Sequence, residues 1–182
     1  TVRLALARLE QDGLIVRERN RGARVRLVSE RDAVGIAEAR AALEPVIARH
    51  AARNATAADV TALRALLKEL RAAAKAGDVV TYGRLNSELH QTLVRIAAHD
   101  TVARLLAQLR SQSITFQYRA VMLPGRMKRS YDEHAALVRA IAAHDAAAAE
   151  EAMRAHLDAA LDALHDSIAA TRAPQITGRA AR

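Results

Sequence analysis

The chain contains no cysteine and no tryptophan, and its 182 residues include only 3 tyrosines and 1 phenylalanine. Without cysteine it can form neither a disulfide nor a thiolate metal site, so imidazole, carboxylate and amide oxygen remain as metal ligands. No stretch is long and apolar enough to span a membrane, and no N-terminal signal pattern is present. We therefore expect a cytoplasmic protein without a membrane partner.

Positive charge is unevenly distributed along the chain. The formal net charge is +8, and residues 1–28 contain seven arginines against three acidic residues. Charge density is therefore much higher in this segment than in the rest of the chain, as expected of a surface that faces nucleic acid. A solvated basic face is the alternative interpretation.

Residues 1–28 predict a helix followed by a β-hairpin. Apolar residues with helical spacing run through residues 2–9 and stop at Asp12-Gly13, a helix C-terminus signal. Residues 14–19 and 23–27 then alternate apolar with charged side chains, and Asn20-Arg21-Gly22 between them has the chemistry of a turn.

From Ser29 onward the periodicity is helical throughout, and Ser29 followed by Asp32 is a helix-capping pattern. We predict helices at about 30–53, 57–76, 79–97, 100–119, 127–143 and 145–171. Six helices with short joints predict an all-α antiparallel bundle over residues 29–172. Residues 173–182 contain little apolar content and are expected to form a disordered tail.

Three histidines at helical positions, His90, His134 and His156, are candidates for one shared site. Asn86 lies four residues before His90, so the two side chains share a helix face. His134 lies at the centre of an apolar stripe and points into the bundle, where an unpartnered imidazole is costly. His156 has small alanines on its face, which leave room for a cavity. The remaining histidines are given no ligand role: His50, His99, His144 and His165.

Short motifs along almost the whole chain occur in a characteristic order. Thr1 to Glu10, Asp12 to Ile15 and Arg21 to Val25 resemble the recognition helix and wing of GntR-type winged-helix regulators. Four later motifs resemble the signatures of the FadR-type C-terminal ligand-binding (FCD) domain, namely Glu38 to Glu44, Asn86 to His90, Glu133-His134 and Met153 to Leu157. The resemblance implies a partial winged helix over residues 1–28, lacking its first two helices, and an effector-binding and dimerisation domain over residues 29–172.

The resemblance also implies that Asn86, His90, His134 and His156 hold a divalent metal ion. Metal-binding members of the family carry aspartate where this chain has Asn86. An amide oxygen is neutral, so it binds the metal less strongly and leaves more positive charge for an anionic effector to neutralise. Three imidazoles and one oxygen suit zinc, with nickel, manganese and iron as alternatives.

Arg40 lies on the apolar stripe of its helix, where an arginine without a partner is rare. An ion pair with Glu44, four residues later, and a contact between subunits are two structural explanations. The resemblance suggests a third explanation, in which Arg40 clamps the carboxylate of a small effector beside the metal.

In the family that the chain resembles, Thr1 and Arg3 would begin the recognition helix, with Arg3 near base edges and Arg8 near phosphate. Arg21 and Gly22 would lie at the tip of the wing, close to the minor groove. Each arginine could instead be a solvated surface charge. Without the first two helices of the winged helix, the chain as given is expected to bind DNA poorly.

Three classes of function are compatible with the sequence. The leading hypothesis is a ligand-responsive repressor that binds a DNA operator as a homodimer and holds a metal and a small carboxylate effector in its bundle. A metal-dependent hydrolase is disfavoured, because Glu133 points about 100° away from His134 and no His-Glu-x-x-His run is present. The third class is a metal-free helical dimerisation module whose histidines belong to the core.

Overall fold

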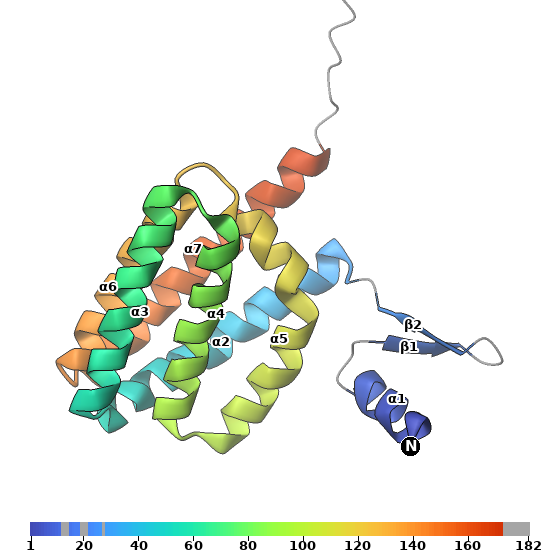
Figure 1. Ribbon diagram of the computed structural model, residues 1–182, viewed down its shortest axis with the longest axis horizontal. Helices are drawn as coiled ribbons and strands as arrows, with labels where there is room; N and C mark the ends of the chain where they lie inside the picture. Colours follow the sequence, from blue (N-terminus) through green and yellow to red (C-terminus); the bar gives the residue numbers. More distant parts are fainter. Residues whose placement is uncertain (12–14, 19–21, 27, 173–182) are drawn as a thin grey trace, which may run out of the picture.

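The computed structural model describes residues 1–11, 15–18, 22–26 and 28–172 (Figure 1). In chain order, the elements are α1 (Val2–Gln11), β1 (Ile15–Glu18), β2 (Gly22–Val25), α2 (Glu30–Asn54), α3 (Ala57–Ala76), α4 (Val79–Ala97), α5 (Asp100–Val121), α6 (Arg126–Ala142) and α7 (Ala146–Arg172). Helices α2 to α7 confirm the predicted bundle, and each end lies within two residues of its predicted position. The predicted helix end at Asp12-Gly13, turn residues 20–21 and tail 173–182 lie outside the described residues.

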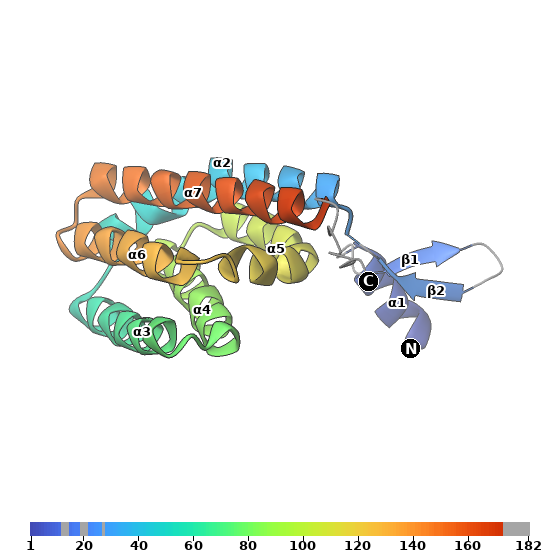
Figure 2. The same cartoon turned by 90° about the horizontal axis from the view of Figure 1, so that it is seen from above.

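The N-terminal helix and hairpin lie beyond one end of the bundle (Figures 1 and 2). Strands β1 and β2 pair in antiparallel fashion, with Ile15 opposite Val25 and Glu18 opposite Gly22. Gly22 has a φ of +85°, in the left-handed region that residues with a side chain rarely adopt. The glycine therefore suits the position where the chain enters the second strand.

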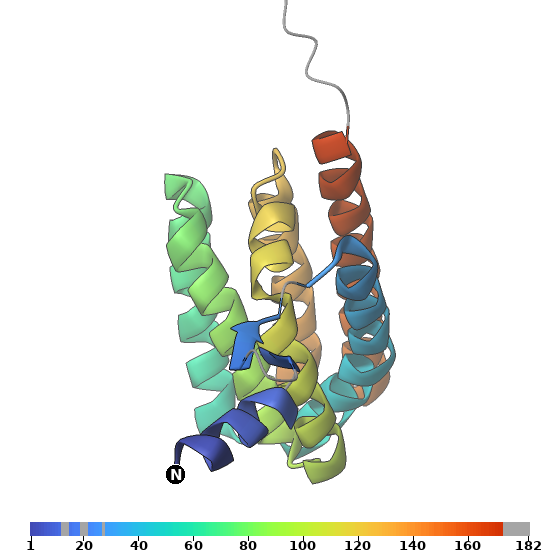
Figure 3. The same ribbon diagram turned by 90° about the vertical axis from the view of Figure 1, so that its right-hand side faces the viewer.

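The six bundle helices are stacked as three pairs (Figures 2 and 3). Seen from above in Figure 2, α2 and α7 form the upper layer, α5 and α6 the middle layer, and α3 and α4 the lower layer. Helix α6 contacts α7 on one side and α3 on the other, while α2 also reaches α4 and α5. Side chains from all three layers therefore meet around α6.

Capping residues fix where the bundle helices begin and end. The Ser29 side chain accepts a hydrogen bond from the backbone N–H of Asp32, and the Asp32 carboxylate accepts one from the backbone N–H of Ser29, as the sequence predicted. Thr56 and Asp59 form the same reciprocal cap at the start of α3. Helix α3 ends at Ala76, and the next residue, Gly77, caps it in the left-handed conformation with a φ of +69°.

The main core lies between the three layers and consists mostly of leucine, isoleucine and alanine. Its most buried members include Leu63, Leu89 and Leu137, each 0% exposed, and His134 is equally inaccessible. A smaller apolar cluster of Ala33, Leu164 and Ile168 lies between α2 and α7. None of the helices in the described ranges is long and apolar enough to cross a membrane.

Candidate metal and anion site

Three buried histidines from three helices meet between the layers. His90 on α4, His134 on α6 and His156 on α7 are 2%, 0% and 4% exposed. Their ring centroids lie between 4.2 and 5.4 Å apart, and one potential ligand nitrogen from each lies within 4.8 Å of the other two. The structure thus brings together the three imidazoles that helical phase had selected, at separations that allow one ion to contact all of them.

One fully buried nitrogen of the cluster, His134 Nδ1, has no hydrogen-bond partner among the described residues. His134 Nε2 lies 3.3 Å from His90 Nε2, whereas His134 Nδ1 is buried and unpartnered. A buried polar atom without a partner raises the free energy of the folded state. Three imidazoles that meet in this way offer ring nitrogens to a cation, and in a chain without thiolates this donor set fits a divalent transition metal.

Burial keeps two of the imidazoles, those of His90 and His134, in the neutral form that binds metals. Burial lowers the pKa of His90 to about 4, although the Glu44 carboxylate opposes that shift. Burial also holds the pKa of His134 well below its ordinary value, and the nearby His156 and His90 rings lower it further. At neutral pH these two rings therefore need lose no proton before they bind a cation.

Glu44 connects His90 to Arg40. His90 Nδ1 donates a hydrogen bond of 2.5 Å to Glu44 Oε2, and Arg40 Nε donates one of 2.7 Å to Glu44 Oε1. A carboxylate at Nδ1 fixes the ring proton there and leaves the Nε2 lone pair for the cluster. The predicted ion pair between Arg40 and Glu44 is therefore present, and its carboxylate also orients a histidine.

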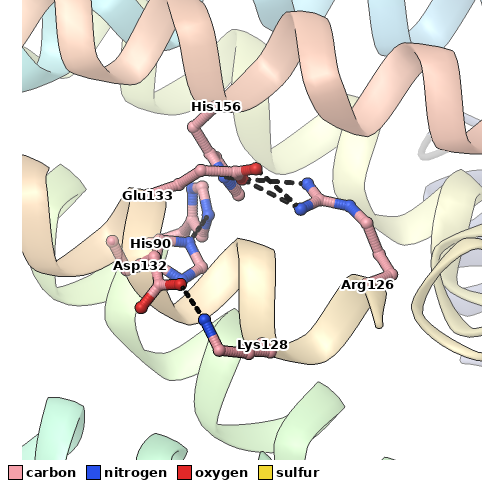
Figure 4. Close-up of polar contacts among 7 residues, drawn as sticks. His90, Arg126, Lys128, Asp132, Glu133 and His156 are labelled. Carbon is pink, nitrogen blue, oxygen red and sulfur yellow. Dashed lines mark hydrogen bonds and ion pairs between the residues drawn. The ribbon is translucent and has the colours of Figure 1, made fainter. Parts of the chain in front are cut away.

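Glu133 connects His156 to Arg126 in the same way (Figure 4). His156 Nδ1 donates a hydrogen bond of 2.7 Å to Glu133 Oε2, and the Arg126 guanidinium grips both carboxylate oxygens at 2.9–3.0 Å. Burial acts to raise the pKa of Glu133, but the His156 hydrogen bond and the Arg126 charge outweigh it and hold that pKa below its usual value. Glu133 is therefore a carboxylate, and Arg126, 4% exposed, is charge-compensated.

A cavity adjoins the histidine cluster, and both arginines line it. Its empty volume is about 690 Å³, including the part that is open to solvent. The polar residues in its wall are Arg40, Asn86, His90, Arg126, Ser130 and His156. Asn86 thus faces the same space as two of the histidines, and Arg40 both pairs with Glu44 and borders the cavity. The structural and the effector-binding explanations of Arg40 are compatible.

Two site residues, Arg126 and Glu133, had weak signals in the sequence. Arg126 lies four residues before Ser130 and eight before His134, so it shares the inward stripe of His134, and an arginine on such a stripe is the signal that could have identified it. Glu133 was expected to point away from His134. It reaches a histidine of the neighbouring helix α7 instead, a contact that no spacing within one helix reports.

The four histidines without a predicted ligand role lie in other contacts. The His50 and His99 rings meet edge to face with centroids 5.0 Å apart, and His99 Nδ1 accepts a backbone N–H near the start of α5. The His144 ring bonds a backbone carbonyl of α2, and His165 is exposed. In the part of the chain that the structure describes, the three-histidine cluster is the one group of metal-ligating side chains.

The predicted DNA-facing residues are described only in part. Thr1 and Arg3 are exposed at the beginning of α1, and Gly22 is exposed at the beginning of β2. Arg8 belongs to α1, but its side chain, like the whole of Arg21, lies outside the described residues. The described members of this set therefore occupy an accessible surface beyond the end of the bundle (Figure 1).

Comparison with known proteins gives a family match and several structural matches. The model of the FCD domain matches residues 35–159. Escherichia coli McbR/YncC superimposes with a TM-score of 0.79 at 19% identity, covering 90% of this chain and 83% of that chain. Streptococcus agalactiae GntR gives a TM-score of 0.62 at 22% identity, covering 88% of this chain and 80% of that chain.

A GntR-family transcriptional regulator from Pseudomonas syringae gives a TM-score of 0.61 at 25% identity, covering 92% of this chain and 71% of that chain. No curated protein matches the sequence. At such identities the structural matches show the fold, whereas the match over residues 35–159 shows the family.

Proposed function

The chain belongs to the FCD-domain family of GntR-type transcription regulators, and from that premise we propose that it is a DNA-binding repressor whose bundle binds a divalent metal ion and a small carboxylate effector. The observation that carries the proposal is the cluster of three buried imidazoles beside a cavity that two arginines line. The family consists of regulators, so no enzymatic activity is assigned to the chain.

His90, His134 and His156 would hold the metal, and Asn86 is the proposed fourth ligand. Zinc is the first choice for three imidazoles and one oxygen, with nickel, manganese and iron as alternatives. A bound divalent cation would supply a positive centre for the effector carboxylate. Imidazole and amide groups that bind a metal through a lone pair bring no negative charge, so the described ligands would leave that positive charge uncompensated, which favours an anionic effector.

Arg40 is the proposed clamp for the effector carboxylate. Its Nε is engaged by Glu44, which leaves the two terminal nitrogens of the planar guanidinium for an anion in the cavity. The side chain is 13% exposed, so a contact formed there is shielded from water and stronger than one at the surface.

The proposed DNA-binding segment is formed by α1 and the hairpin, with Arg3 and Arg8 on the helix and Arg21 and Gly22 at the wing. A homodimer would present two such segments to the two halves of an operator, and the bundle would set their separation. The effector would act by changing the orientation of the two segments. It would bind against α2, and the hairpin directly precedes α2 in the chain.

Metal content and ligand-induced stabilisation test the bundle site. Purified protein is analysed for stoichiometric metal, and thermal unfolding is followed with zinc and with acetate, for wild type, His134→Ala and the exposed-residue control His165→Ala. We expect metal and zinc-dependent stabilisation in wild type and the control, and neither in His134→Ala. Absence of metal from wild type, together with identical zinc responses in all three proteins, would reject the metal site.

DNA binding is tested separately, by mobility shift of the full-length protein on its operator at physiological salt. We expect a specific complex that the carboxylate effector weakens. Binding to the operator that is no tighter than binding to an unrelated duplex contradicts the repressor assignment, whatever the metal experiments show.

A further inference from the structure

The cavity beside the histidines is polar at one end only. The arginines and imidazoles described above form the polar part of the wall together with Asn86 and Ser130, and every other described residue in the wall is apolar. The apolar end is formed mainly by two helices, with Ala33, Ile36 and Ala37 on α2 and Ala160, Leu161 and Leu164 on α7. A ligand that fills the whole cavity must therefore combine a charged head with an apolar body.

The apolar end of the cavity runs along α2 and α7, which lie side by side in antiparallel orientation (Figure 2). It extends from Arg40 back to Ala33 on one helix and from His156 forward to Leu164 on the other. At a rise of about 1.5 Å per helical residue, these spans correspond to roughly 10–12 Å. Ala33 and Leu164 also belong, with Ile168, to a buried apolar cluster.

We propose that the effector is an unbranched aliphatic carboxylate of about eight to ten carbons, the carboxyl carbon included, a length that follows because an extended chain of single bonds advances about 1.2 Å per bond. The carboxylate lies at the end that Arg40 and the histidines form, and the tail lies between α2 and α7. The inference rests on the proposed function for the head-group site and goes beyond it by specifying the tail.

The chemistry of the wall separates this ligand from more polar acids. A sugar acid or a citrate-like acid would place hydroxyl or carboxyl groups against alanine and leucine side chains, where they would lose their bonds to water without replacement. An aliphatic tail gains affinity instead, by about fourfold for each methylene group that it buries. The gain should stop once the tail extends past the apolar wall residues.

A chain-length series tests the proposal with the protein loaded with zinc. Binding of acetate, butyrate, hexanoate, octanoate and decanoate is measured by calorimetry, with gluconate and citrate as polar acids of comparable size. We expect affinity to rise about fourfold per added methylene group and to level off near octanoate or decanoate. Gluconate and citrate should bind no more tightly than acetate.

A pair of matched variants tests where the aliphatic tail lies. Ala160→Leu adds a side chain to the wall of the apolar end, whereas Ala155→Leu adds the same side chain to the exposed face of the same helix. We expect Ala160→Leu to weaken octanoate at least tenfold while acetate affinity and zinc content stay at the wild-type level. Ala155→Leu should leave every value unchanged. Should Ala160→Leu fail to fold, Ala37→Leu makes the same test from the opposite wall.

The outcomes distinguish this inference from the function on which it rests. Equal affinity for acetate and octanoate, or tighter binding of gluconate or citrate, overturns the aliphatic ligand and leaves the carboxylate site intact. Equal weakening of acetate and octanoate by Ala160→Leu also overturns it, since the leucine would then act on the head group. Failure of every acid to bind, acetate included, rejects the proposed carboxylate site itself.

Discussion

His156 and Glu133 are joined by a hydrogen bond of 2.7 Å from the ring Nδ1 to a carboxylate oxygen, and the same carboxylate is clamped by Arg126. Arg40, Glu44 and His90 repeat this arrangement on the other side of the cluster. In each chain of contacts the arginine lines the cavity and the histidine belongs to the candidate metal site. An anion in the cavity and a cation among the histidines therefore act on the same two carboxylates, so their binding should be linked.

Replacing Glu133 by glutamine should weaken metal binding. The variant keeps the shape of the side chain but loses the charge that orients His156, and changes of this kind typically cost about 10- to 100-fold in metal affinity. Zinc affinity is measured by competition with a chelating dye. The neighbouring Asp132→Asn is the control, because Asp132 is exposed and pairs only with Lys128 among the described residues. Equal zinc affinity in the Glu133→Gln protein and wild type would show that the contact is structural.

Removing Arg126 should destabilise the fold because it leaves Glu133 without its charge partner. The loss of one member of a buried ion pair costs about 3–5 kcal/mol, and the 21% exposure of Glu133 places the expected value for Arg126→Met at the lower end. The double variant Arg126→Met with Glu133→Gln should recover part of that loss, since no uncompensated charge remains. Urea denaturation of metal-free protein measures both.

The exposed pair of Lys128 and Asp132 on the same helix provides the comparison for that experiment. Lys128→Met should change the free energy of unfolding by less than about 1 kcal/mol, because surface ion pairs contribute little. If Lys128→Met lowers the free energy of unfolding as much as Arg126→Met does, burial is not the reason why the Arg126 pair stabilises the fold.

The stability of metal-free protein should fall as the pH falls below 6.5. The pKa of His90 is about 4 in the folded chain and about 6.5 when exposed, so between these values the unfolded chain binds a proton that the folded chain does not. The stability associated with neutral His90 is fully present above pH 6.5 and is lost toward pH 4, a change of about 3 kcal/mol in the free energy of unfolding. Urea denaturation at several pH values measures this slope.

Two variants identify the group responsible for that slope. His90→Gln should reduce the slope without abolishing it, because glutamine does not titrate but His134, whose pKa burial also lowers, remains. The exposed His165→Gln should leave the slope at the wild-type value. An unchanged slope in His90→Gln would mean that other groups dominate the acid sensitivity.

Helical phase singled out the three histidines that the structure brings together. A residue four positions along a helix shares a face with the first, and the apolar neighbours of His134 define which face is buried. Because every bundle helix turns its apolar stripe to a common interior, inward histidines on three helices had a high chance of meeting. The same rule placed Arg40 inside and indicated that it needed a partner.

Contacts between helices were not predictable in this way. Whether Glu133 on α6 reaches His156 on α7 depends on the separation and rotation of two helices, which side-chain packing along their whole length determines. The apolar end of the cavity had the same origin, since the alanines of α2 and α7 form a wall only once the two helices lie side by side. In the sequence, only the small alanines on the helix face of His156 indicated a cavity.

Arg3 should determine which DNA sequence the full-length protein selects. It is exposed near the beginning of α1, where a side chain of a recognition helix meets base edges, and a good arginine–guanine contact is worth about 1–3 kcal/mol of discrimination. Arg3→Ala should therefore weaken operator binding about tenfold or more and an unrelated duplex much less. Fluorescence anisotropy at fixed salt measures both, with Arg31→Ala on α2 as an exposed control that should change neither. A loss of the same size on both duplexes would mean that Arg3 contacts phosphate only, and the bases would then have to be read by other residues of the segment.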